Sequence, residues 1–164
     1  PVKNQELLIK AFAKLTNDYP NTKMLWLGGK SPYKALYDSL VPIMVDQFKY
    51  VGVVANVRDF LAQADAMCLS SKMEGMPMTI IEAFSVGTPA LCTPVGGIVN
   101  MIKEGKNGMM SKDLSVDEYY SMMEMFCALS VQEKASMRQS AKESFSKYSI
   151  ENTAHGYLDI YRSK

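Results

Sequence analysis

Short apolar segments alternate with helical patterns along this chain, and several of them end in glycine or a hydroxyl residue. Apolar strands this short, each separated from the next by a helix, are typical of a parallel sheet covered by helices on both faces. We therefore expect an α/β fold with a Rossmann-like, doubly wound parallel sheet. The predicted strands cover residues 23–27, 48–54, 66–69, 89–92 and 108–110.

The predicted helices carry recognisable start and stop signals. In the first, residues 5–19, the apolar side chains fall on one face and Asn4 stands at the N-cap position. Gly87 ends the helix that begins at Pro77, because glycine readily adopts the left-handed conformation that stops a helix. Further helices are expected from Ser31 into the early forties, over 56–64 and 98–103, and from about residues 115, 132 and 152.

Length and charge limit the domain count and the classes of partner. The chain has 164 residues, with no internal repeat or linker, so we expect a single domain over 1–164. Its net charge of +1 provides no general field for a polyanion, which argues against nucleic acid as a partner. No apolar run approaches the length needed to cross a bilayer.

The cysteines and the single histidine give no sign of a metal site. Cys68, Cys92 and Cys127 form no closely spaced pair, which predicts buried, reduced thiols in a cytoplasmic protein. His155 lies in a helical pattern without a second ligand at metal-binding spacing, so a surface or packing role is expected. We predict no bound metal and no cofactor.

Residues 70–84 predict a strand end, a turn and a helix whose first turn lacks a side-chain cap. Pro77 suits the first helical position, which makes Met76 the N-cap residue. Methionine cannot accept hydrogen bonds from the exposed N–H groups of Met78 and Thr79. The positive dipole end of such a helix favours an anion, so this segment predicts a phosphate-binding site.

Glu82 lies one turn further along the same helix, and helical side chains lean toward the helix start. Its carboxylate could therefore contact a sugar diol beside the bound phosphate. The alternative is an ordinary solvated glutamate, because Glu82 falls nearly opposite the apolar face of the helix.

Segments with a glycine, a hydroxyl residue or an asparagine follow four of the predicted strands. Ligands of parallel α/β sheets bind outside the carboxyl ends of the strands, where these segments should gather. A nucleotide is the ligand that such an edge would suit. The segments are Gly28–Gly29, 54–56, Ser70–Ser71 and 93–97.

The segment from 71 to 97 resembles the donor-binding core of retaining glycosyltransferases of the GT-B fold, specifically family 4. Its two acidic residues, Glu74 and Glu82, stand eight positions apart, which is the spacing of the family's Glu-x7-Glu signature. The resemblance extends from Lys3 to the last helix. The matching pieces are Ser71, Glu74–Gly75, Pro77, Glu82–Ala83, 87–89 and Gly96–Gly97.

The resemblance implies a catalytic role for two residues and a ribose contact for a third. Glu74 would face the transferred sugar, and Lys3 would be one member of a cationic pair that neutralises the departing diphosphate. Glu82 would accept hydrogen bonds from the ribose hydroxyls. The donor would be a UDP-, GDP- or ADP-sugar.

The other implied donor contacts come from backbone groups and from two positions near the base. The N–H groups of Met78 and Thr79 would hold the diphosphate. Val54 and Asn56 match positions that line the base, although a strand end and a helix cap would explain them equally well. Gly75, Gly96 and Gly97 would let the backbone approach the donor, and the last two could also form only a tight turn.

The resemblance also implies that the chain is the C-terminal half of a larger enzyme. The arginine partner of Lys3 and the N-terminal acceptor domain are expected outside this sequence, and the last helix is expected to return to that domain. Asn100 stands where the family often has glutamate. The parent would add a sugar to a saccharide or lipid-linked acceptor in polysaccharide or lipopolysaccharide biosynthesis, and the chain alone would be inactive.

We also expect a location for the parent enzyme and consider two alternative functions. The parent is expected in the cytoplasm, with possible peripheral contact at the inner face of the membrane. A GT-B-fold nucleotide-sugar epimerase would share the donor site. A non-catalytic, flavodoxin-like binding module would leave Glu82 solvated.

Overall fold

The computed structural model describes residues 2–29, 38–39 and 46–162, so most of the helix predicted from Ser31 lies outside the described residues. The other predicted elements are present, with ends shifted by up to two residues. In chain order they are α1 Gln5–Asp18, β1 Met24–Leu27, β2 Phe48–Gly52, α3 Val57–Gln63, β3 Met67–Leu69, α4 Met78–Ser85, β4 Ala90–Cys92, α5 Ile98–Met101, β5 Gly108–Met110, α6 Val116–Ala128, α7 Val131–Phe145, a 3₁₀ turn Ser146–Tyr148 and α8 Ile150–Arg162.

All strand pairs are parallel, as predicted, but the hydrogen bonds divide the strands into two sheets. One sheet has the order β1-β2 and the other has the order β3-β4-β5. We expected a single sheet. Within the described residues no ladder joins the two, and β3, β4 and β5 are only three residues long.

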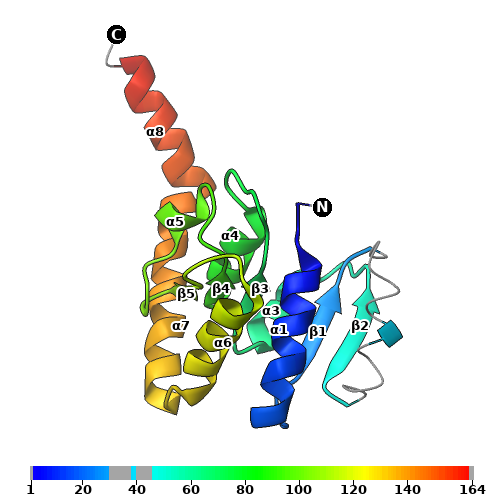
Figure 1. Cartoon of the computed structure of the whole chain (residues 1–164). Helices are drawn as coiled ribbons and strands as arrows, with labels where there is room; N and C mark the ends of the chain where they lie inside the picture. The colour runs from blue at the N-terminus through cyan, green and yellow to red at the C-terminus, as the bar shows by residue number, and fades with distance from the viewer. Residues whose placement is uncertain (1, 30–37, 40–45, 163–164) are drawn as a thin grey trace.

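Helices cover both faces of the three-stranded sheet, which confirms the doubly wound arrangement (Figure 1). Successive residues of β4 point to opposite faces. Leu91 lies in the apolar core formed with α1 and α6, whereas Ala90 and Cys92 lie in the core formed with α4, α5 and α7. The sheet is therefore sandwiched between two apolar cores.

The C-terminal end of α4 closes as the sequence predicts. Gly87 has φ 76°, and its N–H donates to the carbonyl of Phe84 at 3.0 Å. The N–H of Thr88 donates to the carbonyl of Ala83 at 2.9 Å, which completes a Schellman motif. The Thr88 hydroxyl donates to the carbonyl of Leu61 at 2.6 Å, so the end of α4 is also tied to α3.

The start of α1 differs from the prediction in one respect. Asn4 stands at the N-cap position, but its side chain makes no capping hydrogen bond. Its backbone is left-handed, with φ 44° and ψ 43°. A capping side chain normally requires an extended backbone, so the predicted cap is wrong although the helix begins where expected.

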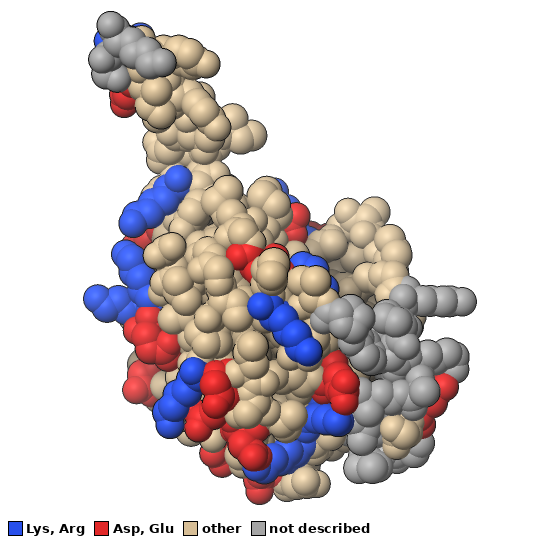
Figure 2. All heavy atoms as spheres, turned by 45° about the horizontal axis from the view of Figure 1, so that its top comes forward, with Lys and Arg blue, Asp and Glu red and all other residues tan. Residues whose placement is uncertain are grey.

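Surface charge and the last helix complete the architecture. Lysine, arginine and acidic side chains are interspersed over the face seen in Figure 2, with no broad field of one sign. Helix α8 projects from the body and is exposed from 151 to 162, His155 included (Figure 1). Among the helices that the structure describes, none combines the length and apolar character needed to cross a bilayer.

All three cysteines are free, as predicted. Cys92 is buried, whereas Cys68 and Cys127 are only partly buried, so full burial was predicted correctly for one thiol alone. Burial raises the pKa of Cys68 to about 12, which keeps this thiol protonated and unreactive at neutral pH.

Candidate functional site

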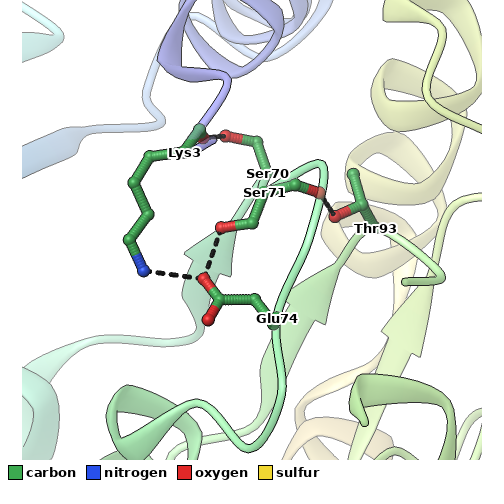
Figure 3. A network of polar contacts seen from close by, with 5 residues as sticks. All are labelled: Lys3, Ser70, Ser71, Glu74 and Thr93. Carbon is green, nitrogen blue, oxygen red and sulfur yellow. Dashed lines mark hydrogen bonds and ion pairs between the residues drawn. The ribbon is translucent and has the colours of Figure 1, made fainter. Parts of the chain in front are cut away.

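The segments that follow β3 and β4 meet at the carboxyl edge of the sheet. The N–H of Thr93 donates to the carbonyl of Leu69 at 3.1 Å, and its hydroxyl donates to the carbonyl of Ser71 at 2.5 Å (Figure 3). Ser71 and Thr93 are both fully buried. The prediction that these two segments lie together is confirmed.

The first residues of the chain are tied to the same edge. The Ser70 hydroxyl lies 3.1 Å from the backbone carbonyl oxygens of both Lys3 and Asn4. The N–H of Lys72 donates to the carbonyl of Val2 at 2.7 Å. These bonds place Lys3 beside the loop that leads to α4.

Glu74 is held by two side chains. Lys3 Nζ lies 2.7 Å and Ser71 Oγ lies 2.6 Å from Glu74 Oε1 (Figure 3). The Glu74 side chain is 12% exposed, whereas that of Lys3 is 60% exposed. Burial raises the pKa of Glu74, but the hydrogen bonds from Lys3 and Ser71 outweigh it and hold the pKa below its ordinary value. The carboxylate is therefore ionised at neutral pH.

The backbone at Glu74 and Gly75 is in close contact with the turn after β4. The N–H of Gly97 donates to the carbonyl of Glu74 at 3.0 Å. A Cβ at Gly96 would lie 1.9 Å from that oxygen, and a Cβ at Gly97 would lie 1.7 Å from the carbonyl oxygen of Gly75. The two glycines are needed for this contact between loops, while their predicted approach to a ligand stays a prediction.

Helix α4 begins one residue later than predicted. Pro77, not Met76, stands at the N-cap position, with φ −70° and ψ 115°. Its carbonyl accepts from the N–H of Ile80 at 3.1 Å, and no side chain caps the helix. The uncapped start is therefore confirmed, and the exposed residues Met78 and Thr79 are the first two of the helix.

Glu82 is exposed on α4, and its carboxylate has no hydrogen bond or ion pair with the residues that the structure describes. The opposite side of the helix is buried through Ile80 and Phe84. The structure does not join Glu82 to the contacts around Glu74. Both interpretations of this residue, a ribose contact and a solvated glutamate, remain open on geometry alone.

Val54 and Asn56 follow β2 in the other sheet, and the structure does not join them to Glu74 by a described contact. Val54 is half-buried and Asn56 is exposed. The Asn56 amide donates to the carboxylate of Asp59 at 2.7 Å and does not cap α3. A simple helix cap therefore does not explain Asn56, and its contact with a base stays a prediction.

One further residue from the sequence analysis can be placed in the structure. Asn100 is exposed on the short helix α5, close in sequence to Gly97. Among the described residues, no three His, Cys, Asp or Glu side chains come together as a candidate metal site.

The sequence alone did not reveal the bond from Ser71 to Glu74 or the bond from Thr93 to Ser71. The positions of the two hydroxyl residues in the sequence did indicate that they lie close together. Both hydroxyl residues follow strands that a parallel sheet places side by side, so their proximity was predictable but the direction of their bonds was not.

The family model described as Glycosyl transferases group 1 matches residues 1–144. The chain belongs to this family. It is 29% identical over 110 residues to the N-acetyl-alpha-D-glucosaminyl L-malate synthase of Bacillus anthracis, a match that covers 66% of this chain and 29% of that enzyme. It is 24% identical over 175 residues to the D-inositol 3-phosphate glycosyltransferase of Corynebacterium urealyticum, with 99% of this chain and 40% of that enzyme covered.

Solved glycosyltransferases share the fold. Anabaena HepE in complex with UDP aligns with a TM-score of 0.87 and 20% identity, over 100% of this chain and 46% of HepE. The fold is thus one half of a GT-B glycosyltransferase, as the resemblance implied. The chain spans less than half the length of these relatives.

Proposed function

We propose that this chain is the donor-binding domain, over 1–164, of a retaining glycosyltransferase of family 4 that transfers a hexose from a nucleotide diphosphate sugar. The acceptor would be a saccharide or a lipid-linked saccharide, bound by a second domain. Family membership supports transferase chemistry. The complexes of HepE with UDP and with UDP-glucose support a nucleotide sugar as the donor.

One observation carries the proposal. The uncapped start of α4 lies immediately after the loop that anchors Glu74, and Glu82 lies one turn further along the same helix. The N–H groups of Met78 and Thr79 would hold the diphosphate, because the dipole of the helix favours negative charge there. The Glu82 carboxylate would accept from the ribose hydroxyls.

Glu74 and Lys3 would act at the other end of the donor. Glu74 would contact the hydroxyls of the transferred sugar or stabilise charge near its anomeric carbon. Lys3 would neutralise the diphosphate as the glycosidic bond breaks, because negative charge builds on this leaving group. These roles need no metal ion at the diphosphate.

Helix α8 supports the assignment of the chain to one half of a larger enzyme. Its exposed apolar residues would pack against the second domain. The whole enzyme would work in the cytoplasm, peripheral to the membrane where the acceptor is lipid-linked. The large exposed side chains are Ile150, Tyr157, Leu158, Ile160 and Tyr161.

A GT-B-fold epimerase and a flavodoxin-like binding module are the rival functions. Family membership supports the transferase over both. Epimers of the donor sugar formed by the full-length protein without any acceptor would favour the epimerase. No thermal shift with millimolar nucleotide would favour the binding module.

Calorimetry on this chain with UDP, GDP and ADP tests the donor role. We expect weak binding of at least one nucleotide and a loss of about tenfold or more in Glu82→Ala, the range for a hydrogen bond to a charged group. Glu151→Ala is the matched control, because Glu151 is also an exposed glutamate on a helix, α8. Equal binding by wild type and Glu82→Ala would overturn the role of Glu82.

A further inference from the structure

The Glu74 carboxylate has one buried partner and one exposed partner. Ser71 is fully buried and donates to Oε1 at 2.6 Å. Lys3 donates to the same oxygen at 2.7 Å from a side chain that is 60% exposed. An exposed ion pair is weak and a lysine side chain is flexible, so Lys3 can exchange this partner for another anion. The buried hydroxyl of Ser71 has no such freedom.

Only one carboxylate oxygen of Glu74 is engaged. Both bonds end on Oε1, and Oε2 has no partner among the described residues (Figure 3). No buried side-chain oxygen or nitrogen of these residues lacks a hydrogen bond. Oε2 is therefore accessible, and it is the oxygen that can accept from a ligand.

Ser71 is itself held in place by the neighbouring strand. The buried hydroxyl of Thr93, the residue after β4, donates to the Ser71 carbonyl at 2.5 Å. The N–H of Gly97 fixes the backbone carbonyl of Glu74 from the same side. The loop from 71 to 74 is therefore anchored at both ends before any ligand binds.

We propose that Ser71 is a positioning residue for Glu74: its hydroxyl, aimed by Thr93, fixes Oε1 so that Oε2 faces the donor sugar, also when Lys3 moves to the diphosphate. The inference rests on the proposed donor role of the chain. In this proposal the two partners of Glu74 have different roles. Ser71 sets the geometry of the carboxylate, and Lys3 is free to follow the negative charge of the donor.

The first test needs no ligand. The χ1 rotamer of Glu74 is measured from three-bond NMR couplings in wild type, Lys3→Ala, Ser71→Ala and Ser111→Ala. Ser111 is the matched control, a buried serine whose hydroxyl donates to the backbone carbonyl of Asp113. We expect one rotamer in wild type, Lys3→Ala and Ser111→Ala, and rotamer averaging in Ser71→Ala. Averaging in Lys3→Ala, or a single rotamer in Ser71→Ala, would overturn the proposal.

Thr93 gives an independent variant that leaves the Ser71 side chain intact. Thr93→Val removes the hydroxyl and should produce averaging at Glu74, whereas Thr93→Ser keeps it and should restore the single rotamer. A merely structural role would give the same Glu74 couplings in both variants. That result would overturn the role of Thr93 in aiming Ser71.

The second test compares UDP with UDP-glucose by calorimetry on the same chain. Ser71→Ala should weaken UDP-glucose binding by about tenfold relative to Ser111→Ala and leave UDP binding unchanged, because Glu74 would contact only the sugar. If Ser71→Ala binds UDP as wild type does and also keeps its affinity for UDP-glucose, the sugar-facing role of Glu74 is overturned. A wild type that binds neither nucleotide would count against the proposed function, whereas the couplings would still decide whether Ser71 holds Glu74.

Discussion

Glu74 and Glu82 belong to one segment and stand eight positions apart, yet their surroundings are opposite. Glu74 is 12% exposed on its side chain, bonded to Ser71 and Lys3, and has a backbone held by Gly97. Glu82 is exposed and has no described partner for its carboxylate. The two acids therefore cannot be understood from their spacing alone.

The difference indicates how the site is divided. The part around Glu74 is organised by the protein itself, through the ends of β3 and β4 and the first residues of the chain. The part around α4 and Glu82 presents unsatisfied groups that a ligand could satisfy. Variants on the Glu74 side should change stability, and variants on the Glu82 side should change only binding.

The largest effect is expected at Gly97. In Gly97→Ala the new Cβ would lie 1.7 Å from the Gly75 carbonyl oxygen, so the loop at Glu74 must move away from the turn after β4. We expect a loss of roughly 2–4 kcal/mol in the free energy of unfolding, measured by urea denaturation at pH 7. Gly75→Ala is the control, since a Cβ there meets nothing within 4 Å, and equal stability of the two variants would show that the loops are not in contact.

Glu82 tests the other side of the comparison. Glu82→Ala should keep the stability of wild type within about 0.5 kcal/mol, because the side chain is exposed. Removing both ribose hydroxyls from UDP should weaken binding to wild type by about tenfold, the range for a charged hydrogen bond, and should cost nothing more in Glu82→Ala. If calorimetry shows that the loss from removing the hydroxyls adds to the loss from Glu82→Ala, Glu82 does not contact the ribose.

The pKa of Glu74 predicts a pH-dependent difference between wild type and Glu74→Gln. Because this pKa is lower in the folded protein, ionisation of Glu74 stabilises the fold above the unfolded pKa of a glutamate, about 4.3. That contribution is lost as the pH falls through the folded pKa. Urea unfolding from pH 7 downward should show wild type losing stability relative to Glu74→Gln below about pH 4.5. A constant difference across this range would contradict the assigned environment.

Among the variants on the Glu74 side, the smallest effect on stability is expected for Lys3→Ala. The lysine side chain is 60% exposed, so the loss in unfolding free energy should stay below about 1 kcal/mol. The binding free energy of a nucleotide diphosphate should fall by more than this loss in unfolding free energy, because Lys3 would also face the phosphates. A variant that unfolds more easily by several kcal/mol, with unchanged binding, would make Lys3 a structural residue only.

The sequence predicted the order of elements well, because the strands and helices differ clearly in apolar periodicity. It also predicted that Ser71 and Thr93 share one edge, and that α4 starts without a cap. It placed the start of α4 one residue early, since a proline suits both the N-cap and the first helical position. Asparagine tolerates the left-handed backbone found at Asn4, but its predicted role as a capping side chain pointed to an extended one.

The contacts of Glu74 could not be predicted from sequence, because Lys3 is 71 positions away and their meeting depends on the bonds from Ser70 to the first residues. The glycine pair was predictable as a place of close approach. Its partner, the backbone at Glu74 and Gly75, required the structure.

An NMR titration of this chain with UDP, followed through the backbone amide shifts, tests the central claim most directly. If α4 holds the diphosphate, the largest changes fall on the N–H groups of Met78 and Thr79, with little change in the surface depression lined by Gly87, Arg138 and Lys142. Changes centred on that depression, or no change at Met78 and Thr79 at saturating UDP, would contradict the assignment of α4 as the donor-binding helix.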